Sequence, residues 1–140
     1  MAALFFDSSS LVKRYAVEIG TNWVFNLVRP SAKNRLYLAR ITGVEVIAAL
    51  IKRIRVGSLT SSANTKAVKR FEREFSNRYV LIEVSPKVIQ TAMTLAKNYT
   101  LRGYDAVQLG VLGTKAHFLT LRTRFFVQFP SFSTKTSKFP

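Results

Sequence analysis

The sequence of 140 residues contains no cysteine, one histidine and only seven acidic residues. Without cysteine the chain cannot form a disulfide, a thiolate metal site or a thiol nucleophile. His117 is the only histidine, so it has no second histidine with which it could bind zinc. The chain also lacks a phosphate-binding glycine loop, a dinucleotide motif and a nucleophile-elbow serine. These absences exclude many common chemistries and direct attention to the few carboxylates.

Long apolar runs are absent as well. No run approaches the roughly 18 apolar residues that a membrane-spanning helix needs. The first seven residues lack the basic start and the length of a signal peptide. We therefore expect a soluble, cytoplasmic protein with no membrane contact. At this length and 48% hydrophobic residues, we expect a single domain over residues 1–129, atypical from about residue 110, and a flexible tail over residues 130–140.

The charge of the chain is strongly one-sided. Lysine and arginine number 22 against seven acidic residues, which gives a net charge of +15 and a pI near 10.9. A surface of this kind attracts polyanions, and nucleic acid is the usual partner of such a domain. An acidic protein partner, or a basic domain with no such partner, is the alternative.

Segments with the apolar pattern of a strand alternate along the chain with segments that have the apolar pattern of a helix. The predicted strands are residues 3–6, 35–39, 79–84 and 117–121. The predicted helices are residues 9–18, 21–28, 42–56, 63–79, 85–98 and one that starts after Gly103. Strands that alternate with helices predict an α/β fold, here a three-layer α/β/α domain around a central, mainly parallel sheet.

Two of these helices have a clear apolar face. In the helix over residues 42–56, the apolar stripe is Val44, Ile47, Ala48 and Ile51. Val46, Ala49 and Leu50 are apolar too, so we expect this helix to be buried over much of its girth. In the helix over residues 63–79, the predicted buried residues are Val68, Phe71 and Phe75. The outer face of that second helix carries Arg70, Glu74 and Arg78 at a spacing that favours ion pairs.

The seven acidic residues divide into two groups. Four have an ordinary interpretation as solvated surface charges: Glu18, Glu72, Glu74 and Glu83. The other three stand at helix starts: Asp7, Glu45 and Asp105. Each of these three also has a structural interpretation: Asp7 as an N-cap, Glu45 as part of a capping box with Thr42, and Asp105 as an anion favoured by the helix dipole.

Considered together, the three carboxylates indicate a site. Helix starts that follow parallel strands gather at one edge of the sheet. Carboxylates that cluster there repel one another unless a cation neutralises them. Mg²⁺ prefers a few carboxylate oxygens, retains several waters and often binds phosphates. In a basic chain this combination suits hydrolysis of a phosphodiester, with a metal-bound water of lowered pKa.

Three segments carry a family resemblance. The segments "FFDSSSLVKRY", "ARITGVEVIAAL" and "LRGYDAVQL" resemble, in order, the three signature segments of PIN domains, in particular of VapC-type toxins. The match runs from Leu4 to about Leu109. The resemblance implies an α/β/α fold and Mg²⁺- or Mn²⁺-dependent endoribonuclease activity. It also implies a type II toxin–antitoxin pair, with RNA as substrate, a cognate acidic antitoxin and a homodimer.

The same resemblance assigns roles to individual residues. Asp7 and Asp105 would be the main metal ligands, and Glu45 would complete the catalytic site or orient water. Ser8 or Ser9 would hydrogen-bond a carboxylate or a phosphate, with helix capping as the equally weighted alternative. The candidates for contacts with the RNA backbone are Lys13, Arg14, Arg40 and Arg102, each of which has a solvated charge as its alternative.

The C-terminal part departs from the family pattern. PIN domains commonly carry a fourth acid after a late strand, but "HFLTLRTRF" offers Arg122 there, and no acid follows Asp105. Gly110 and Gly113 are expected to interrupt the last helix, since glycine costs about 1 kcal/mol against alanine in a helix interior. The alternative function is therefore a catalytically impaired PIN-fold relic, or an RNA- and antitoxin-binding module.

Overall fold

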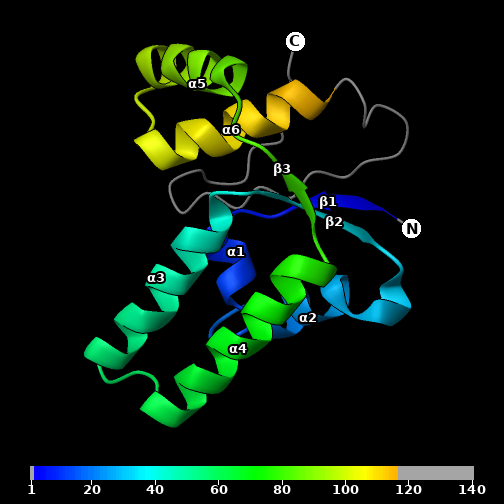
Figure 1. Cartoon of the computed structure of the whole chain (residues 1–140), viewed down its shortest axis with the longest axis vertical. Helices are drawn as coiled ribbons and strands as arrows, with labels where there is room; N and C mark the ends of the chain where they lie inside the picture. The colour runs from blue at the N-terminus through cyan, green and yellow to red at the C-terminus, as the bar shows by residue number, and fades with distance from the viewer. Residues whose placement is uncertain (1, 117–140) are drawn as a thin grey trace.

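The computed structural model describes residues 2–116, the last two by their backbone alone. Within this range three strands and a series of helices follow one another in the predicted order (Figure 1). The predicted strand over residues 117–121, the position of Arg122 and the predicted tail lie outside the described residues. Among residues 2–116, no helix is both long and apolar enough to span a membrane.

The three strands form one parallel sheet. They are β1 (Ala3–Phe5), β2 (Arg35–Ala39) and β3 (Val80–Ile82), and they lie in the order β1-β2-β3. In register, Leu4 pairs with Leu36, and Leu38 pairs with Leu81. The prediction of a parallel sheet is confirmed for this part of the chain, since both strand pairs are parallel.

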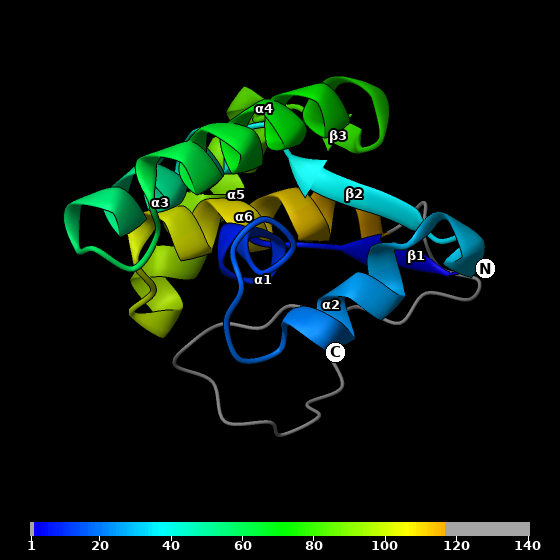
Figure 2. The same cartoon turned by 90° about the horizontal axis from the view of Figure 1, so that it is seen from below.

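Helices cover both faces of the sheet. They are α1 (Ser8–Val12), α2 (Thr21–Val28), α3 (Thr42–Arg55), α4 (Ser61–Asn77), α5 (Pro86–Tyr99) and α6 (Gly103–Ala116), with a short 3-10 helix at Pro30–Ala32. Figure 1 shows α5 and α6 above the strands and the other helices below them, and Figure 2 shows the same arrangement turned by 90°. The predicted α/β/α fold is therefore confirmed.

Side chains on either side of the strands divide the apolar interior into two cores. Successive residues of a strand point to opposite faces. Leu4 and Phe6 accordingly enter the larger core with α1 to α4, whereas Phe5 enters the smaller core under α5 and α6. Ser85 caps α5 as predicted, because its Oγ accepts a hydrogen bond from the Val88 backbone N–H at 3.3 Å.

The first helix is shorter than predicted. Helix α1 ends at Val12 instead of continuing to residue 18. The backbone N–H groups of Arg14 and Tyr15 donate to carbonyls three residues back, which tightens the chain and ends the helix. This turn directs both side chains onto Glu74 of α4. A tertiary contact therefore determines where the helix ends.

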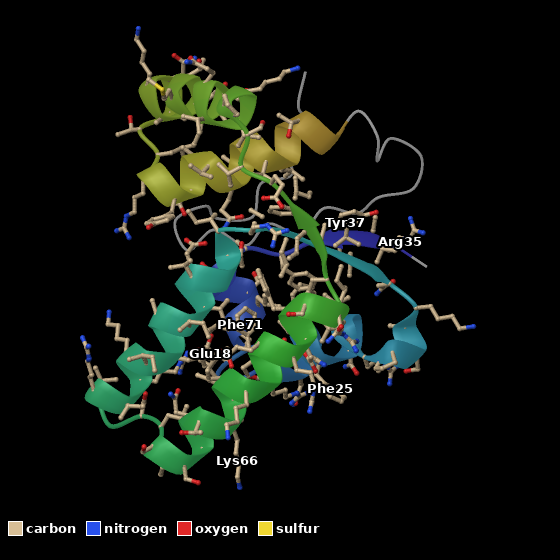
Figure 3. The ribbon with its side chains drawn as sticks, in the orientation of Figure 1. Glu18, Phe25, Arg35, Tyr37, Lys66 and Phe71 are labelled. Carbon is tan, nitrogen blue, oxygen red and sulfur yellow. The ribbon has the colours of Figure 1, made fainter. Side chains whose placement is uncertain are left out.

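The predicted stripe of α3 is wrong for all but Ile47, which packs against the larger core, whereas the expected wider burial of this helix includes the buried Val46 and Leu50. Val44 is 68% exposed and Ile51 is 38% exposed, whereas the buried residues of this helix are Thr42, Val46 and Leu50. Helix α3 is apolar around most of its girth, so periodicity alone admitted two faces. The packing of α3 against α1 and α4 selects between them. In α4 the prediction is confirmed: Phe71, labelled in Figure 3, is buried. Its ring lies edge-on to that of Tyr15.

The expected interruption of the last helix was also wrong. Helix α6 continues through Gly110 and Gly113 to Ala116. A Cβ atom at Gly110 would lie 3.0 Å from the Val88 carbonyl oxygen of α5. Glycine at this position therefore permits the two helices to approach closely, and their packing offsets its low helix propensity.

Candidate active site

The three predicted acidic residues stand at the starts of three helices. Asp7 follows β1 and is the N-cap of α1, Glu45 lies in the first turn of α3, and Asp105 lies in the first turn of α6. The charges of Asp7 and Asp105 both act on the Glu45 carboxyl group. The structure therefore brings the three predicted carboxylates into one electrostatic environment.

Asp7 is held in a single orientation by its neighbours. Its side chain is buried, and the residue is only 5% exposed. One carboxylate oxygen accepts a hydrogen bond from the Ser10 backbone N–H at 2.8 Å, and the other accepts one from the Ser9 hydroxyl at 2.8 Å. Each oxygen retains a lone pair for a further ligand. Asp7 is thus both a helix cap and a carboxylate with free coordinating capacity.

The Glu45 carboxyl group is affected both by burial and by neighbouring charges. Burial raises the pKa of Glu45 above its ordinary value, and the charges of Asp7 and Asp105 raise it further. Hydrogen bonds from Gln108 and Ser8 act in the opposite direction without reversing the shift. The Gln108 amide Nε2 donates to Glu45 Oε2 at 2.8 Å. A partly desolvated carboxylate among other acids is typical of a functional site.

The predicted capping box is wrong. The N-cap of α3 is Ile41, which makes no side-chain cap bond, and Thr42 is already helical. The buried Thr42 hydroxyl accepts a hydrogen bond from Gln108 Nε2 at 2.9 Å. The structural interpretation of Glu45 therefore fails, because its carboxylate contacts α6 instead of the start of its own helix.

Sequence reasoning missed Gln108. It lies on α6 three residues after Asp105, so the two side chains share one face of the helix. In the same way, Thr42 and Glu45 share one face of α3. The i, i+3 spacing from Asp105 was the available signal, since a polar residue at that spacing would face the same site.

The donor set fits a hydrated cation and does not form a ready-made cage. Among residues 2–116, no three acidic or histidine side chains group tightly enough to hold a metal by themselves. Mg²⁺ nevertheless commonly binds through one or two carboxylates and several waters. Two observations favour such a cation here. Glu45 lies in the field of two other carboxylates, and the buried Gln108 Oε1 accepts no hydrogen bond in the described part of the chain.

The structure reduces the set of candidate phosphate-binding cations. The Arg14 side chain is 4% exposed and bonds Glu74, so its assignment to RNA is corrected to a structural role. Lys13 is also occupied: its Nζ donates to the Ile19 carbonyl oxygen at 2.9 Å and lies 3.0 Å from Glu18. Glu18 in turn bonds Arg53, so it is not a solvated charge (Figure 3).

Two cations stay exposed near the candidate site. Arg40 follows β2 directly and pairs with Glu83 at 2.6 Å, a pair that is open to solvent on both sides. Arg102 precedes α6, three residues from Asp105, and forms no ion pair within the described range. Arg102 is therefore the predicted phosphate contact that the structure leaves most available.

Glu74 is another correction to the sequence interpretation. It was expected on the solvated face of α4, but it accepts hydrogen bonds from Arg14 and from the Tyr15 hydroxyl. Arg70 also pairs with it, at 3.3 Å, as expected for residues four apart. Arg78 does not, and its buried Nε has no partner among the described residues.

Comparison with protein-family models and with curated proteins finds no match for this chain. The function of the chain must therefore be inferred from the geometry of the site and from the three motifs that contribute its residues.

Proposed function

We propose that this chain is a metal-dependent endoribonuclease of the PIN-domain family, a VapC-type toxin of a type II toxin–antitoxin pair. One observation carries the proposal: Asp7, Glu45 and Asp105, from three separate motifs, share one electrostatic environment in a chain of net charge +15. Repulsion among carboxylates favours a divalent cation, and the basic charge favours RNA.

Asp7 and Asp105, with Glu45, are the residues that would hold Mg²⁺ or Mn²⁺. When bound, such a cation supplies a water of lowered pKa and positive charge for the scissile phosphate. Ser9 and Ser10 restrict the motion of the Asp7 carboxylate, through the Ser9 hydroxyl and the Ser10 N–H. This restriction maintains the geometry that cleavage of a phosphodiester requires.

Glu45 is suited to completing the metal site or to orienting a bound water. Its carboxyl group is partly buried and lies in the field of Asp7 and Asp105. Gln108 and Ser8 both hydrogen-bond this group, which restricts its orientation. Arg102 completes the proposed site as a contact for the RNA backbone, because it is exposed close to Asp105 along the chain.

The proposed partners follow from the same charge. An acidic antitoxin segment would neutralise part of the surface and cover the site, and a homodimer is expected from the resemblance. A toxin of this kind acts on RNA in the cytoplasm. Light scattering of the chain alone and with an acidic antitoxin peptide measures both associations, and a monomer that ignores the peptide would contradict them.

A second function is supported by a different observation. Among residues 2–116 no acidic group forms a ready-made metal cage, and no acid follows Asp105 in the sequence. A PIN-fold relic, or an RNA- and antitoxin-binding module, would retain this core without a working catalytic site. This function predicts RNA binding that divalent metal leaves unchanged.

The test compares the wild-type chain with Asp7→Asn on structured RNA in Mg²⁺ or Mn²⁺. Asparagine caps a helix as well as aspartate does, so the variant keeps the start of α1 while losing the charge. Glu72→Gln, on the exposed face of α4, is the charge-matched control. We expect cleavage by the wild type and the control and background cleavage by Asp7→Asn. Equal cleavage by all three, or by none, rejects the enzyme.

A further inference from the structure

Gln108 connects two elements of the candidate site. It lies on α6, is 3% exposed, and uses both hydrogens of its amide. Its Nε2 donates to the Thr42 hydroxyl at 2.9 Å and to Glu45 Oε2 at 2.8 Å, and both acceptors are on α3. A purely structural link between α3 and α6 would explain these two bonds.

A structural link does not explain the other end of the amide. Gln108 Oε1 is buried and accepts no hydrogen bond from residues 2–116. Buried amide oxygens nearly always have a donor, and the exceptions commonly have a functional reason. Because Oε1 belongs to the same planar amide as Nε2, the bonds of Nε2 to Thr42 and Glu45 fix the position of Oε1 as well. The nearby charges of Asp7 and Asp105 favour a cation and its bound waters as the source of a donor there.

We propose that Gln108 is a positioning residue of this site: its Nε2 fixes the Glu45 carboxylate, and its Oε1 accepts a hydrogen bond from a water bound to a divalent cation. The inference rests on the proposed function for the cation alone, and not on cleavage of RNA. Residues that orient carboxylate ligands and bound water in this way typically contribute 10–100-fold to metal affinity or activity.

The test uses Gln108→Met, which keeps the length of the side chain but removes both the donor and the acceptor. Gln90→Met is the matched control, because Gln90 is exposed on α5. Thr42→Val removes one acceptor of Gln108 while leaving its bond to Glu45 in place. Gln108→Asn keeps the amide but shortens the side chain by one methylene, which moves the amide away from Glu45. This variant replaces Gln108→Met in the test if the methionine variant does not fold. For each variant we measure the Kd for Mn²⁺ by calorimetry without RNA, and the Tm without metal.

The expected result is a Kd for Mn²⁺ that rises about 10–100-fold in Gln108→Met and changes less than about twofold in Gln90→Met and Thr42→Val. Where RNA is cleaved, kcat falls by a similar factor while KM for RNA stays within about twofold. A purely structural role would lower the metal-free Tm of Gln108→Met and of Thr42→Val, and would leave the Kd unchanged.

The outcomes separate this inference from the proposed function. Weakened Mn²⁺ binding in Gln108→Met with no cleavage by the wild type supports the positioning role and rejects the ribonuclease. Wild-type cleavage that depends on Asp7, with unchanged Kd and kcat in Gln108→Met, overturns the positioning role and retains the ribonuclease. A wild type that does not bind Mn²⁺ at all overturns the inference whatever the RNA assay shows.

Discussion

Arg14 and Glu74 form a two-bond ion pair across 60 positions of sequence. Arg14 Nε donates to Glu74 Oε2 at 2.7 Å and Nη2 donates to Oε1 at 2.8 Å. The Tyr15 hydroxyl also donates to Glu74, at 2.6 Å, and lies 2.5 Å from the Tyr79 hydroxyl. This network attaches the segment after α1 to α4. The attached segment directly follows α1, whose N-cap is Asp7.

Removing one partner of this pair should destabilise the fold. Glu74→Gln leaves the Arg14 guanidinium buried without a counter-charge, so we expect a loss of about 3 kcal/mol in the free energy of unfolding. The control is Glu83→Gln, which opens the exposed pair with Arg40 and should cost less than about 1 kcal/mol. Urea denaturation measures both. Similar losses in the two variants would show that the buried pair contributes no more to the free energy of unfolding than the exposed pair does.

Acid should weaken the same contact. The bonds from Arg14 and Tyr15, together with the Arg14 charge, outweigh burial and lower the pKa of Glu74 from 4.5 to about 2. Because the folded pKa is depressed, the stabilisation is complete above pH 4.5 and is lost as the pH falls from 4.5 to about 2. It amounts to at most about 3 kcal/mol. Urea curves of the wild type and of Glu74→Gln should therefore converge as the pH falls, and a gap that stays constant would contradict the assignment.

Glu45 should show the opposite dependence on pH. Burial and the charges of Asp7 and Asp105 raise its pKa in the folded state, so its contribution is favourable below pH 4.5 and is lost as the pH rises through the folded pKa. We expect Glu45→Gln to melt a few degrees above the wild type at pH 7 and to lose this advantage near pH 4. Calorimetry at the two pH values measures the difference. If Glu45→Gln were less stable than the wild type at pH 7, repulsion between Glu45 and the carboxylates of Asp7 and Asp105 would not destabilise the fold.

Two glycines of α6 should respond oppositely to the same substitution. Gly110→Ala would place a Cβ 3.0 Å from the Val88 carbonyl oxygen, so we expect it to destabilise the fold by about 1–3 kcal/mol. Among residues 2–116, a Cβ at Gly113 meets nothing within 4 Å, so Gly113→Ala should stabilise by about 0.5–1 kcal/mol through helix propensity. Chemical denaturation of the wild type and both variants measures the change in the free energy of unfolding. Stabilisation by both would mean that α5 and α6 do not pack closely at Gly110.

Arg102 should contribute to RNA binding where Arg14 does not. Arg102→Ala is expected to weaken binding to single-stranded RNA severalfold at low salt. The slope of log K against log salt concentration should become shallower by about one, because one counterion fewer is released. Arg55→Ala, an exposed charge at the far end of α3, is the control. Fluorescence anisotropy across a salt series, in EDTA to prevent cleavage, measures the slope. Equal effects of the two substitutions would indicate diffuse attraction without a specific contact.

Much of the fold could be predicted because local patterns determine it. Short apolar segments predicted β1, β2 and β3, and the segments of helical periodicity between them predicted the helices, in the observed order. The positions of Asp7, Glu45 and Asp105 at three helix starts are also local facts. Because the carboxyl ends of parallel strands lie at one edge of a sheet, the starts of α1 and α3, which follow β1 and β2, could be expected to converge. Helix α6 follows α5, so its start is placed by the packing of these two helices.

The tertiary structure decided what local patterns leave open. Helix α3 is apolar around most of its girth, so only its packing against α1 and α4 determines which face is buried. Glu74 was interpreted as a surface charge because Arg14 lies 60 positions away. The role of Gln108 was missed because its two acceptors lie 66 and 63 positions away. Periodicity reports each residue's relation to its own helix or strand, whereas these contacts arise only when separate elements pack together.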